Sequence, residues 1–127
     1  MTDRLPGDAL AVLRGAHEVQ IETRPAPDVP PHLTTIWVVV DDADRAFIRT
    51  YRGPASRWYR EATASGRVAL LADGQRINAR VVPATDAASV ESCSDAFRAK
   101  YRSSGASLAA MLVPEVLGTT LELLPVA

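Results

Sequence analysis

Apolar residues in the first half of the chain are spaced for short strands. Residues 18–24 alternate apolar with polar side chains, a pattern typical of a half-buried strand. Residues 33–40 (LTTIWVVV) are apolar on both faces near their end, which predicts a central strand. The polar residues 41–44 predict a turn into a strand over 45–51. We therefore expect the strands over residues 33–40 and 45–51 to pair as an antiparallel hairpin at the centre of a barrel.

Turn signals and alternation continue in the second half. Asp73 and Gly74 form a strong hairpin turn signal between predicted strands over 67–72 and 75–83. Residues 119–124 alternate once more and predict the final strand. The chain is therefore expected to contain about six strands.

Helical spacing appears between these strands. Residues 8–14 predict a short helix, within an N-terminal segment of residues 1–17 that packs on the rest of the chain. The longest predicted helix runs over residues 87–102, with Asp86 as its N-cap. Its inward face is expected to carry Val90, Cys93, Phe97 and Tyr101.

The order of the predicted elements excludes a regular alternation of parallel strands and helices. It favours a mainly β protein of the α+β class, a six-stranded antiparallel barrel whose openings are plugged by helices. At 127 residues the chain has the length of one domain. We therefore expect residues 1–127 to form a single domain.

The charge balance argues against a broad polyanion-binding surface. The chain has 14 Lys and Arg residues and 15 Asp and Glu residues, a formal net charge of −1 at pH 7. General nucleic-acid or membrane binding requires a broad basic excess, so we expect neither partner. The sequence shows no signal-peptide pattern and no apolar run long enough to span a bilayer, which predicts a cytoplasmic protein.

Side chains that commonly carry chemistry are few and scattered. His17 and His32 have no metal-ligand spacing, and the chain has no zinc motif, P-loop or nucleophile elbow. Cys93 lies on the inward face of its predicted helix, where an inert buried thiol is more common than a nucleophile. We therefore predict no catalytic side chain and no metal site. If the chain is an enzyme, a bound redox cofactor would supply the reaction.

Arginines are concentrated in residues 47–60 (FIRTYRGPASRWYR). The stretch predicts a strand end, a Gly-Pro turn and a helix start with Ser56 as N-cap. Arginine opposes the helix dipole at such a place, but a bound phosphate would make the same charges favourable. Two explanations stay open. The turn forms an anion site, or its arginines are solvated and pair with Asp41, Asp42, Asp44 or Glu61.

Four stretches resemble a known family: TTIWVVV, FIRTYRGPASRWYREATASGRV, FRAKYRSSG and TTLELLPV. They are similar to an uncharacterised bacterial family, domain of unknown function 2255, from about residue 18 to residue 126. More distantly, the order of strand, glycine turn, Trp-Tyr helix, hairpin, helix and final strand resembles the deazaflavin-dependent nitroreductases. Both families sit among the FMN-binding split barrels, which commonly dimerise and hold a flavin or deazaflavin beside the dimer interface.

The resemblance implies a split β-barrel, a homodimer, and FMN or a deazaflavin coenzyme as cofactor. The implied function is a flavin- or deazaflavin-dependent oxidoreductase acting on a small substrate. A non-catalytic dimeric binding module for an anionic ligand, such as haem or a metabolite, is the alternative. The nitroreductase pattern has a basic residue where this chain has Pro54, and Arg52 is the candidate to replace it. The residues implied to hold the cofactor and its phosphate are Arg49, Arg52, Gly53, Ser56, Arg57 and Trp58.

Overall fold

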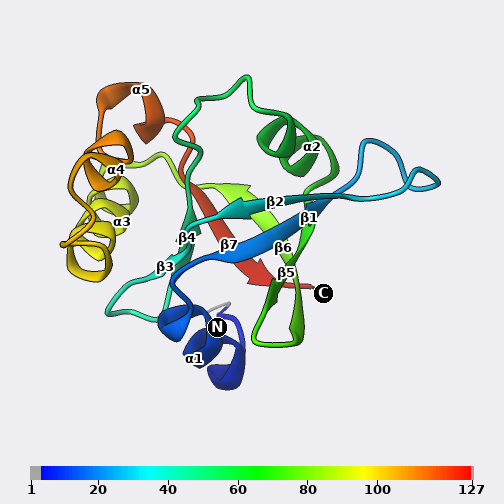
Figure 1. Cartoon of the computed structure of the whole chain (residues 1–127), viewed down its shortest axis with the longest axis horizontal. Helices are drawn as coiled ribbons and strands as arrows, with labels where there is room; N and C mark the ends of the chain where they lie inside the picture. The colour runs from blue at the N-terminus through cyan, green and yellow to red at the C-terminus, as the bar shows by residue number, and fades with distance from the viewer. Residues whose placement is uncertain (1–3, 127) are drawn as a thin grey trace.

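A strongly curled antiparallel sheet forms the body of the protein (Figure 1). The computed structural model describes residues 4–126, and all strand pairs within this range are antiparallel. The strands are β1 (Val19–Thr23), β2 (His32–Ile36), β3 (Val39–Val40), β4 (Ala46–Ile48), β5 (Arg67–Ala72), β6 (Gln75–Pro83) and β7 (Leu121–Pro125). Their order across the sheet is β2-β1-β5-β6-β7-β4-β3. The predicted antiparallel α+β barrel is confirmed, with seven strands in the described range rather than six.

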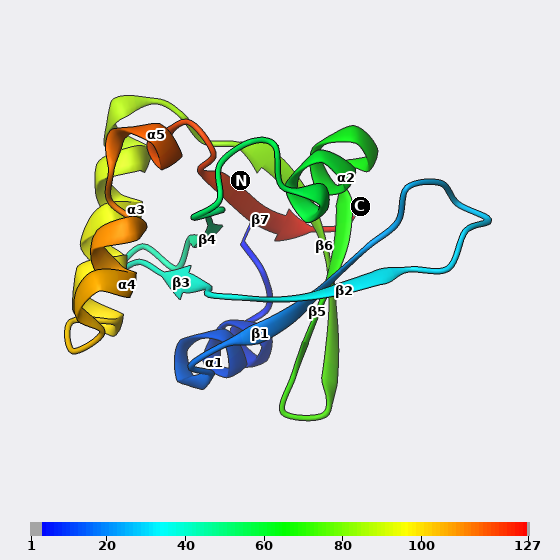
Figure 2. The ribbon, with the colours of Figure 1, turned by 45° about the horizontal axis from the view of Figure 1, so that its top comes forward.

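Helices close the ends of the curled sheet and cover one side of it. They are α1 (Gly7–Gly15), α2 (Arg57–Ser65), α3 (Ala87–Lys100), α4 (Gly105–Ala110) and α5 (Pro114–Leu117). In Figures 1 and 2, α1 and α2 lie at opposite ends of the barrel, and α3, α4 and α5 gather beside β3 and β4. Leu13 of α1 and Trp58 of α2 are buried in the same core inside the sheet. Of the predicted N-terminal segment 1–17, residues 1–3 lie outside the described range.

Residues 33–40 do not form one strand, and the prediction of a central strand is wrong. The segment is broken at Trp37 and Val38, and its two parts, β2 and β3, are the opposite edges of the sheet. Trp37 instead stacks on Tyr101, just past the end of α3, with 3.8 Å between the ring centroids. The Val38 carbonyl accepts hydrogen bonds from the side chains of Lys100 (2.7 Å) and Tyr101 (3.3 Å). Side chains from the end of α3 therefore hold the seam where the barrel is split.

The predicted hairpin after this seam is present, at an edge of the sheet and not at its centre. In β3 and β4, Val39 pairs with Phe47 and Val40 with Ala46. Every residue of β4 is buried because both faces of the strand are covered. Ala46 and Ile48 face the core inside the sheet, whereas Phe47 joins a second core under α3. The second core consists of Val39, Phe47, Ala84, Cys93, Phe97, Tyr101 and Met111.

Two local sequence signals are confirmed in detail. The Asp86 carboxylate accepts a hydrogen bond of 3.0 Å from the Ser89 amide and caps α3, as predicted. Asp73 and Gly74 connect β5 to β6 with φ values of 52° and 71°, the left-handed geometry that a two-residue hairpin turn requires.

On the predicted inward face of α3, Cys93, Phe97 and Tyr101 are buried and Val90 is half-buried. No helix in residues 4–126 has the length and apolar character needed to cross a bilayer.

Candidate functional site

A cleft of about 780 Å³ lies between β2, the link from β4 to α2, and the region around α4. Five of the six residues proposed from the sequence line it, and Gly53 does not. The lining residues are Glu18, Thr34, Thr35, Ile36, Trp37, Arg49, Thr50, Tyr51, Arg52, Ser56, Arg57, Trp58, Ala106, Ser107, Ala110 and Met111. The structure therefore brings the arginine-rich turn together with aromatic residues and a helical wall that lie far from it in sequence.

Gly53 shapes the turn that brings Arg52 and Arg57 to the same cleft. Its φ of +87° is a conformation that side chains with a Cβ rarely adopt. The Gly53 amide donates to the Thr50 carbonyl at 3.1 Å, and its own carbonyl accepts from the Ser56 amide at 3.2 Å. These two bonds fold the chain back tightly between β4 and α2. Gly53 thus positions the arginines rather than contacting the cleft.

Ser56 stands at the N-cap position of α2, but the prediction that its side chain caps the helix is wrong. Its hydroxyl forms a hydrogen bond of 2.9 Å with the Thr50 hydroxyl and makes no capping bond. The first turn of α2 also contains no acidic residue. The partial positive charge of the helix start is therefore not offset by Ser56, directly beside the cationic Arg57.

Arg49 is a buried cation in the cleft wall, with 1% of its surface exposed. Its guanidinium donates to three neutral oxygens: Thr120 Oγ1 at 2.8 Å, Met111 O at 3.0 Å and Val90 O at 2.9 Å. It also lies 5.5 Å from the centroid of the Phe97 ring. Within the described residues it has no carboxylate partner. Burial lowers the pKa of Arg49, yet arginine stays protonated in proteins, so its positive charge remains uncompensated behind the cleft.

Arg52 and Arg57 are exposed, and neither has an ion-pair partner among residues 4–126. Arg52 Nε donates to the Tyr51 hydroxyl at 3.0 Å, and its guanidinium lies 5.3 Å from the Tyr51 ring centroid. The Arg57 side chain forms no hydrogen bond with another described residue. Two arginines therefore line the cleft with donors available to a ligand.

Among the described residues, no carboxylate named for the solvated alternative forms an ion pair with an arginine of the cleft, and Asp44 pairs with Arg14 instead. Glu61 contacts His32 Nδ1 at 2.9 Å and accepts from the Thr23 hydroxyl at 2.8 Å. Burial raises the pKa of Glu61, but the bonds from His32 and Thr23 outweigh it, and with the charge of Arg57 they hold that pKa below its usual value. Asp41 accepts from the Ser92 hydroxyl at 2.6 Å. Neither carboxylate forms an ion pair with the arginines of the cleft in the described chain.

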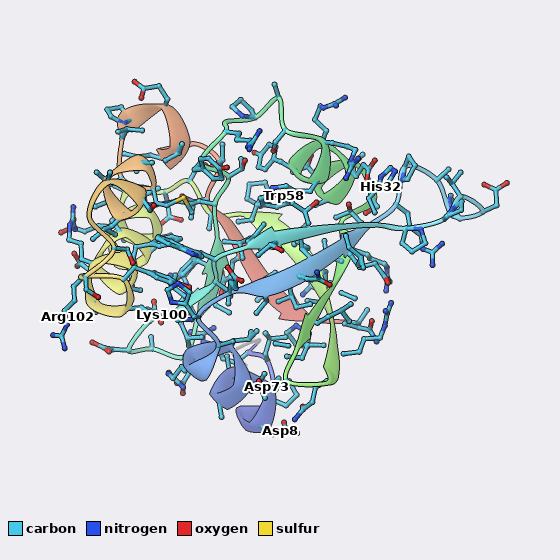
Figure 3. The ribbon with its side chains drawn as sticks, in the orientation of Figure 1. Asp8, His32, Trp58, Asp73, Lys100 and Arg102 are labelled. Atoms are coloured by element: carbon cyan, nitrogen blue, oxygen red, sulfur yellow. The ribbon has the colours of Figure 1, made fainter. Side chains whose placement is uncertain are left out.

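Aromatic side chains complete the wall, and sequence reasoning found only one of them. Trp58 is 6% exposed and belongs mainly to the core (Figure 3). Trp37 and Tyr51 also line the cleft, and Tyr51 is 59% exposed. The one available signal for Trp37 was a large aromatic within a run of β-branched residues. That signal could not show that Trp37 leaves the strand.

Groups with nucleophilic or metal-binding capacity do not gather in the cleft. Cys93 is fully buried in the second core, and burial raises its thiol pKa to about 12. A thiol with that pKa is protonated at neutral pH and inert. Residues 4–126 contain no group of three or more His, Cys, Asp or Glu side chains placed to hold a metal ion.

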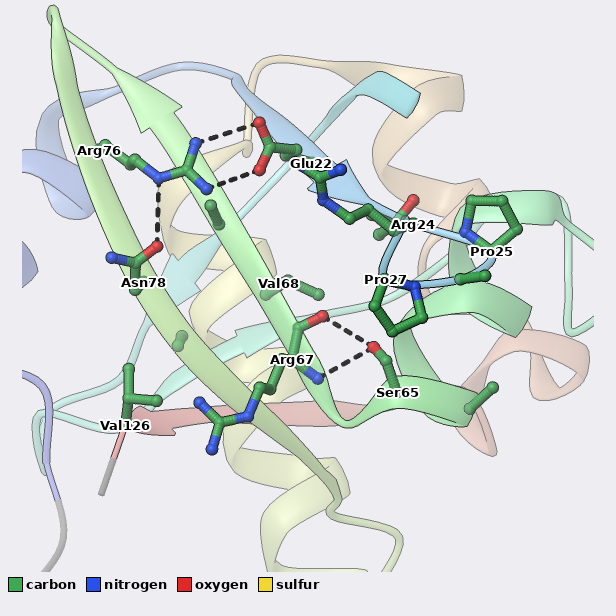
Figure 4. A pocket seen from close by; sticks show the side chains of 15 residues that line it. Glu22, Arg24, Pro25, Pro27, Ser65, Arg67, Val68, Arg76, Asn78 and Val126 are labelled. Carbon is green, nitrogen blue, oxygen red and sulfur yellow. Dashed lines mark hydrogen bonds and ion pairs between the residues drawn. The ribbon is translucent and has the colours of Figure 1, made fainter. Parts of the chain in front are cut away.

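A second cleft of about 830 Å³ lies on the outer face of β1, β5 and β6 and contains none of the proposed site residues (Figure 4). Arg76 occupies one side of it and pairs with Glu22 through two hydrogen bonds of 3.0 and 2.6 Å. This pairing lowers the pKa of the Glu22 carboxylate. Glu22 neutralises Arg76, but the exposed Arg24 and Arg67 also line this cleft, so it too carries positive charge.

Solved structures with the same fold show which class of protein the barrel and cleft define. A conserved hypothetical protein from Mycobacterium tuberculosis matches at a TM-score of 0.66 and 16% identity, over 100% of this chain and 84% of that chain. HutZ, the haem storage protein from Vibrio cholerae, matches at 0.64 and 12% identity, over 98% and 92%. A provisionally named pyridoxamine 5′-phosphate oxidase from Listeria innocua matches at 0.62 and 14% identity, over 94% and 92%. The chain is therefore a split-barrel protein.

The sequence comparison gives the family directly. Residues 9–123 match the profile of domain of unknown function 2255, described as an uncharacterized protein conserved in bacteria. The chain belongs to this family, as its sequence motifs indicated. No curated protein matches the chain in sequence.

Proposed function

We propose that this split-barrel protein is a flavin- or deazaflavin-dependent oxidoreductase that acts on a small substrate. FMN or a deazaflavin coenzyme would bind in the cleft, with its phosphate at the arginine-rich turn between β4 and α2. Such a cofactor supplies the electron-transfer chemistry that the side chains of the cleft lack. We also propose that the protein is cytoplasmic.

One observation carries this proposal: three arginines line the cleft without a carboxylate partner among the described residues. Arg52 and Arg57 are exposed and would donate charge-assisted hydrogen bonds to a phosphate. Arg49 is buried and each of its three guanidinium nitrogens already donates to a protein oxygen, so it would act mainly through its charge. The amides after Ser56 would add donors from the uncapped helix start.

The dimensions and composition of the cleft fit a ligand of this kind. Its volume of about 780 Å³ is within the usual range for cofactor sites. Trp37, Trp58 and Tyr51 give it an aromatic wall for a ring, and the arginines give it a cationic side for an acid group. Of its lining residues, Glu18 is the one carboxylate, so an anionic ligand meets little repulsion.

The proposal is tested by titrating the purified protein with FMN and with a deazaflavin while recording absorption spectra and thermal midpoints. A ligand at 100 times its Kd should stabilise the folded state by about 2.7 kcal/mol, because it binds only that state. The reduced complex should then be reoxidised by a small quinone or nitroaromatic acceptor under anaerobic conditions. If neither cofactor raises the midpoint of unfolding, the proposed function is wrong.

A non-catalytic binding module for haem or another anionic metabolite is the second candidate. The arginines of the cleft favour any anionic ligand, and its described lining has no histidine or cysteine to act as a nucleophile. The same absence leaves a haem iron without two of its common protein ligands. HutZ, a haem storage protein, also shows that the fold can serve storage. Tight binding of haem, or binding of a flavin whose reduced form no small acceptor reoxidises, would support the binding module over the oxidoreductase.

A further inference from the structure

Trp37 is an anchored aromatic side chain in the wall of the cleft. Tyr101 covers one face of its indole ring, with the ring planes within 2° of parallel and the centroids 3.8 Å apart. Tyr101 is 1% exposed, and its hydroxyl donates to the His17 carbonyl at 2.7 Å. The His17 ring meets both aromatic rings edge-on, at 6.0 Å from Trp37 and 5.4 Å from Tyr101. The indole is therefore held in one orientation, and although it is half-buried, part of its surface lines the cleft.

The exposed Arg57 enters the cleft from a different side than Trp37. Arg57 is the first residue of α2, whereas Trp37 is anchored to Tyr101 at the end of α3. In Figures 1 and 2, α2 lies alongside β2, whereas α3 lies beyond the end of β2 that leads into β3. Thr34, Thr35 and Ile36 of β2 line the stretch of cleft between the two ends. The cleft thus has its exposed cation Arg57, next to Trp58, at one end and Trp37 at the other, where the buried Arg49 also lies, 5.5 Å from the Phe97 ring.

This arrangement suits a ligand with a flat ring at one end and an acid group at the other. A ring that stacks on an immobilised indole gains dispersion and quadrupole interactions without ordering a mobile side chain. An acid group gains charge-assisted hydrogen bonds from an arginine fork. The binding free energies of the ring and of the acid group add only when one ligand reaches both ends of the cleft.

We propose that Trp37 is the ring-binding, specificity-determining residue of the cleft. The cleft then selects planar aromatic ligands that bear an anionic group, with the ring at Trp37 and the anion at Arg57. This inference rests on the proposed function and extends it, because it assigns the orientation of the ligand and the residue that recognises its ring.

The test compares Trp37→Leu, which removes the ring but keeps apolar volume beside Tyr101, with Trp37→Phe, which keeps a ring. The probes are FMN, riboflavin and ribose 5-phosphate, which carry ring and phosphate, ring alone, and phosphate alone. We expect Trp37→Leu to weaken FMN and riboflavin about tenfold and Trp37→Phe at most about threefold. Neither change should alter ribose 5-phosphate binding. Arg57→Ala should do the opposite, weakening FMN and ribose 5-phosphate but not riboflavin.

Fluorescence provides an independent readout. The chain has two tryptophans, so in a Trp58→Phe background all indole emission comes from Trp37. Riboflavin bound against Trp37 should quench that emission. Thermal midpoints of each variant without ligand establish that it is folded before affinities are compared.

Each outcome separates the ring site from the proposed function. If FMN and riboflavin bind Trp37→Leu as tightly as wild type, the ring site is wrong and the proposed function stands. If Trp37→Leu loses ribose 5-phosphate as strongly as FMN, Trp37 only supports the cleft, and the inference is overturned. If wild type binds none of the three probes and no deazaflavin, the proposed function fails and this inference fails with it.

Discussion

Lys100 Nζ donates a hydrogen bond of 2.7 Å to the carbonyl oxygen of Val38, at the seam where the barrel is split. The same nitrogen donates to Leu13 O in α1 at 2.8 Å. One side chain thus joins α3, α1 and the edge between β2 and β3. Within the described residues no carboxylate pairs with Lys100, and burial lowers its pKa to about 8.

Replacing this lysine should loosen the seam. We expect Lys100→Met to lower the free energy of unfolding by about 2 kcal/mol, since two carbonyls lose a charged donor while the buried charge is relieved. Urea denaturation measures the change. Arg102→Met is the matched control, because Arg102 is exposed two residues later, and it should leave stability unchanged within about 0.5 kcal/mol. Equal midpoints for both variants would show that the Lys100 contacts do not contribute to stability.

Lys100 and Cys93 should give the protein an unusual alkaline stability profile. Between pH 8 and 10.5 the unfolded chain keeps a Lys100 proton that the folded chain has released, so stability rises with pH. From pH 9 to 12 the folded chain keeps a Cys93 proton that the unfolded chain has released, so stability falls. Tyr101, with a pKa raised by burial to about 12, adds a further fall above pH 10. Together, these three groups should make the free energy of unfolding rise from pH 8 to 9, stay level, and then decline above pH 10.

Two variants resolve this profile into its parts. In Lys100→Met the rise between pH 8 and 9 should disappear, leaving only the decline. In Cys93→Ala the rise should continue to about pH 10 before the Tyr101 contribution reverses it. Denaturation midpoints at half-unit steps of pH suffice. If the stability of the wild type falls steadily from pH 8, the conclusion that burial lowers the pKa of Lys100 is wrong.

Arg49 should influence ligand affinity through its charge alone. Both Arg49→Lys and Arg49→Met should lose about 2–4 kcal/mol of stability, because neither side chain can serve three separate oxygen acceptors. Arg49→Lys keeps the positive charge and should bind FMN within about threefold of wild type, whereas Arg49→Met should bind about tenfold more weakly. Calorimetric titration at 15 °C compares them in the folded state. Equal affinities would show that the buried charge does not reach the ligand.

Arg52 and Arg57 should contact the anion directly. Each charge-assisted bond is worth about 1.5–3 kcal/mol, so Arg52→Ala and Arg57→Ala should each weaken FMN binding about tenfold or more. Arg60→Ala is the control, since Arg60 is exposed on the same helix and does not line the cleft. All three should keep wild-type stability. If Arg60→Ala weakens binding as much as Arg57→Ala, the effect is a general loss of charge and not a site.

We also expect a homodimer. Leu33 is 49% exposed on β2, which is an edge strand and therefore has backbone groups without a strand partner. Sedimentation at tens of micromolar, roughly the working range for specific dimers, should show a dimer, and Leu33→Asp should shift it toward monomer. Val113→Asp, at another exposed apolar residue (38%), serves as the control. A monomer at that concentration would contradict the prediction.

Local sequence signals determined much of the fold. The Asp73-Gly74 turn, the Asp86 cap and the alternation of residues 18–24 each act over a few residues, and the structure confirms all three. Nearest-neighbour chemistry is sufficient for such features, because φ preferences and side-chain caps depend little on the rest of the chain. The clustering of arginines before α2 was likewise visible from spacing, and the structure gathers Arg49, Arg52 and Arg57 at one cleft.

Tertiary packing decided the rest. The pattern of residues 33–40 is that of a central strand. However, Trp37 stacks on Tyr101 and the Val38 carbonyl accepts hydrogen bonds from the end of α3, so the segment is divided into two edge strands, β2 and β3. Those partners lie some sixty residues away, and no local pattern encodes them. The same holds for Arg49, whose burial depends on three acceptors: Val90 of α3, Met111 just after α4, and Thr120 just before β7. The sequence by itself determined which charges and turns exist, and only the folded chain decided which of them meet, because long-range contacts select among conformations that local preferences leave open.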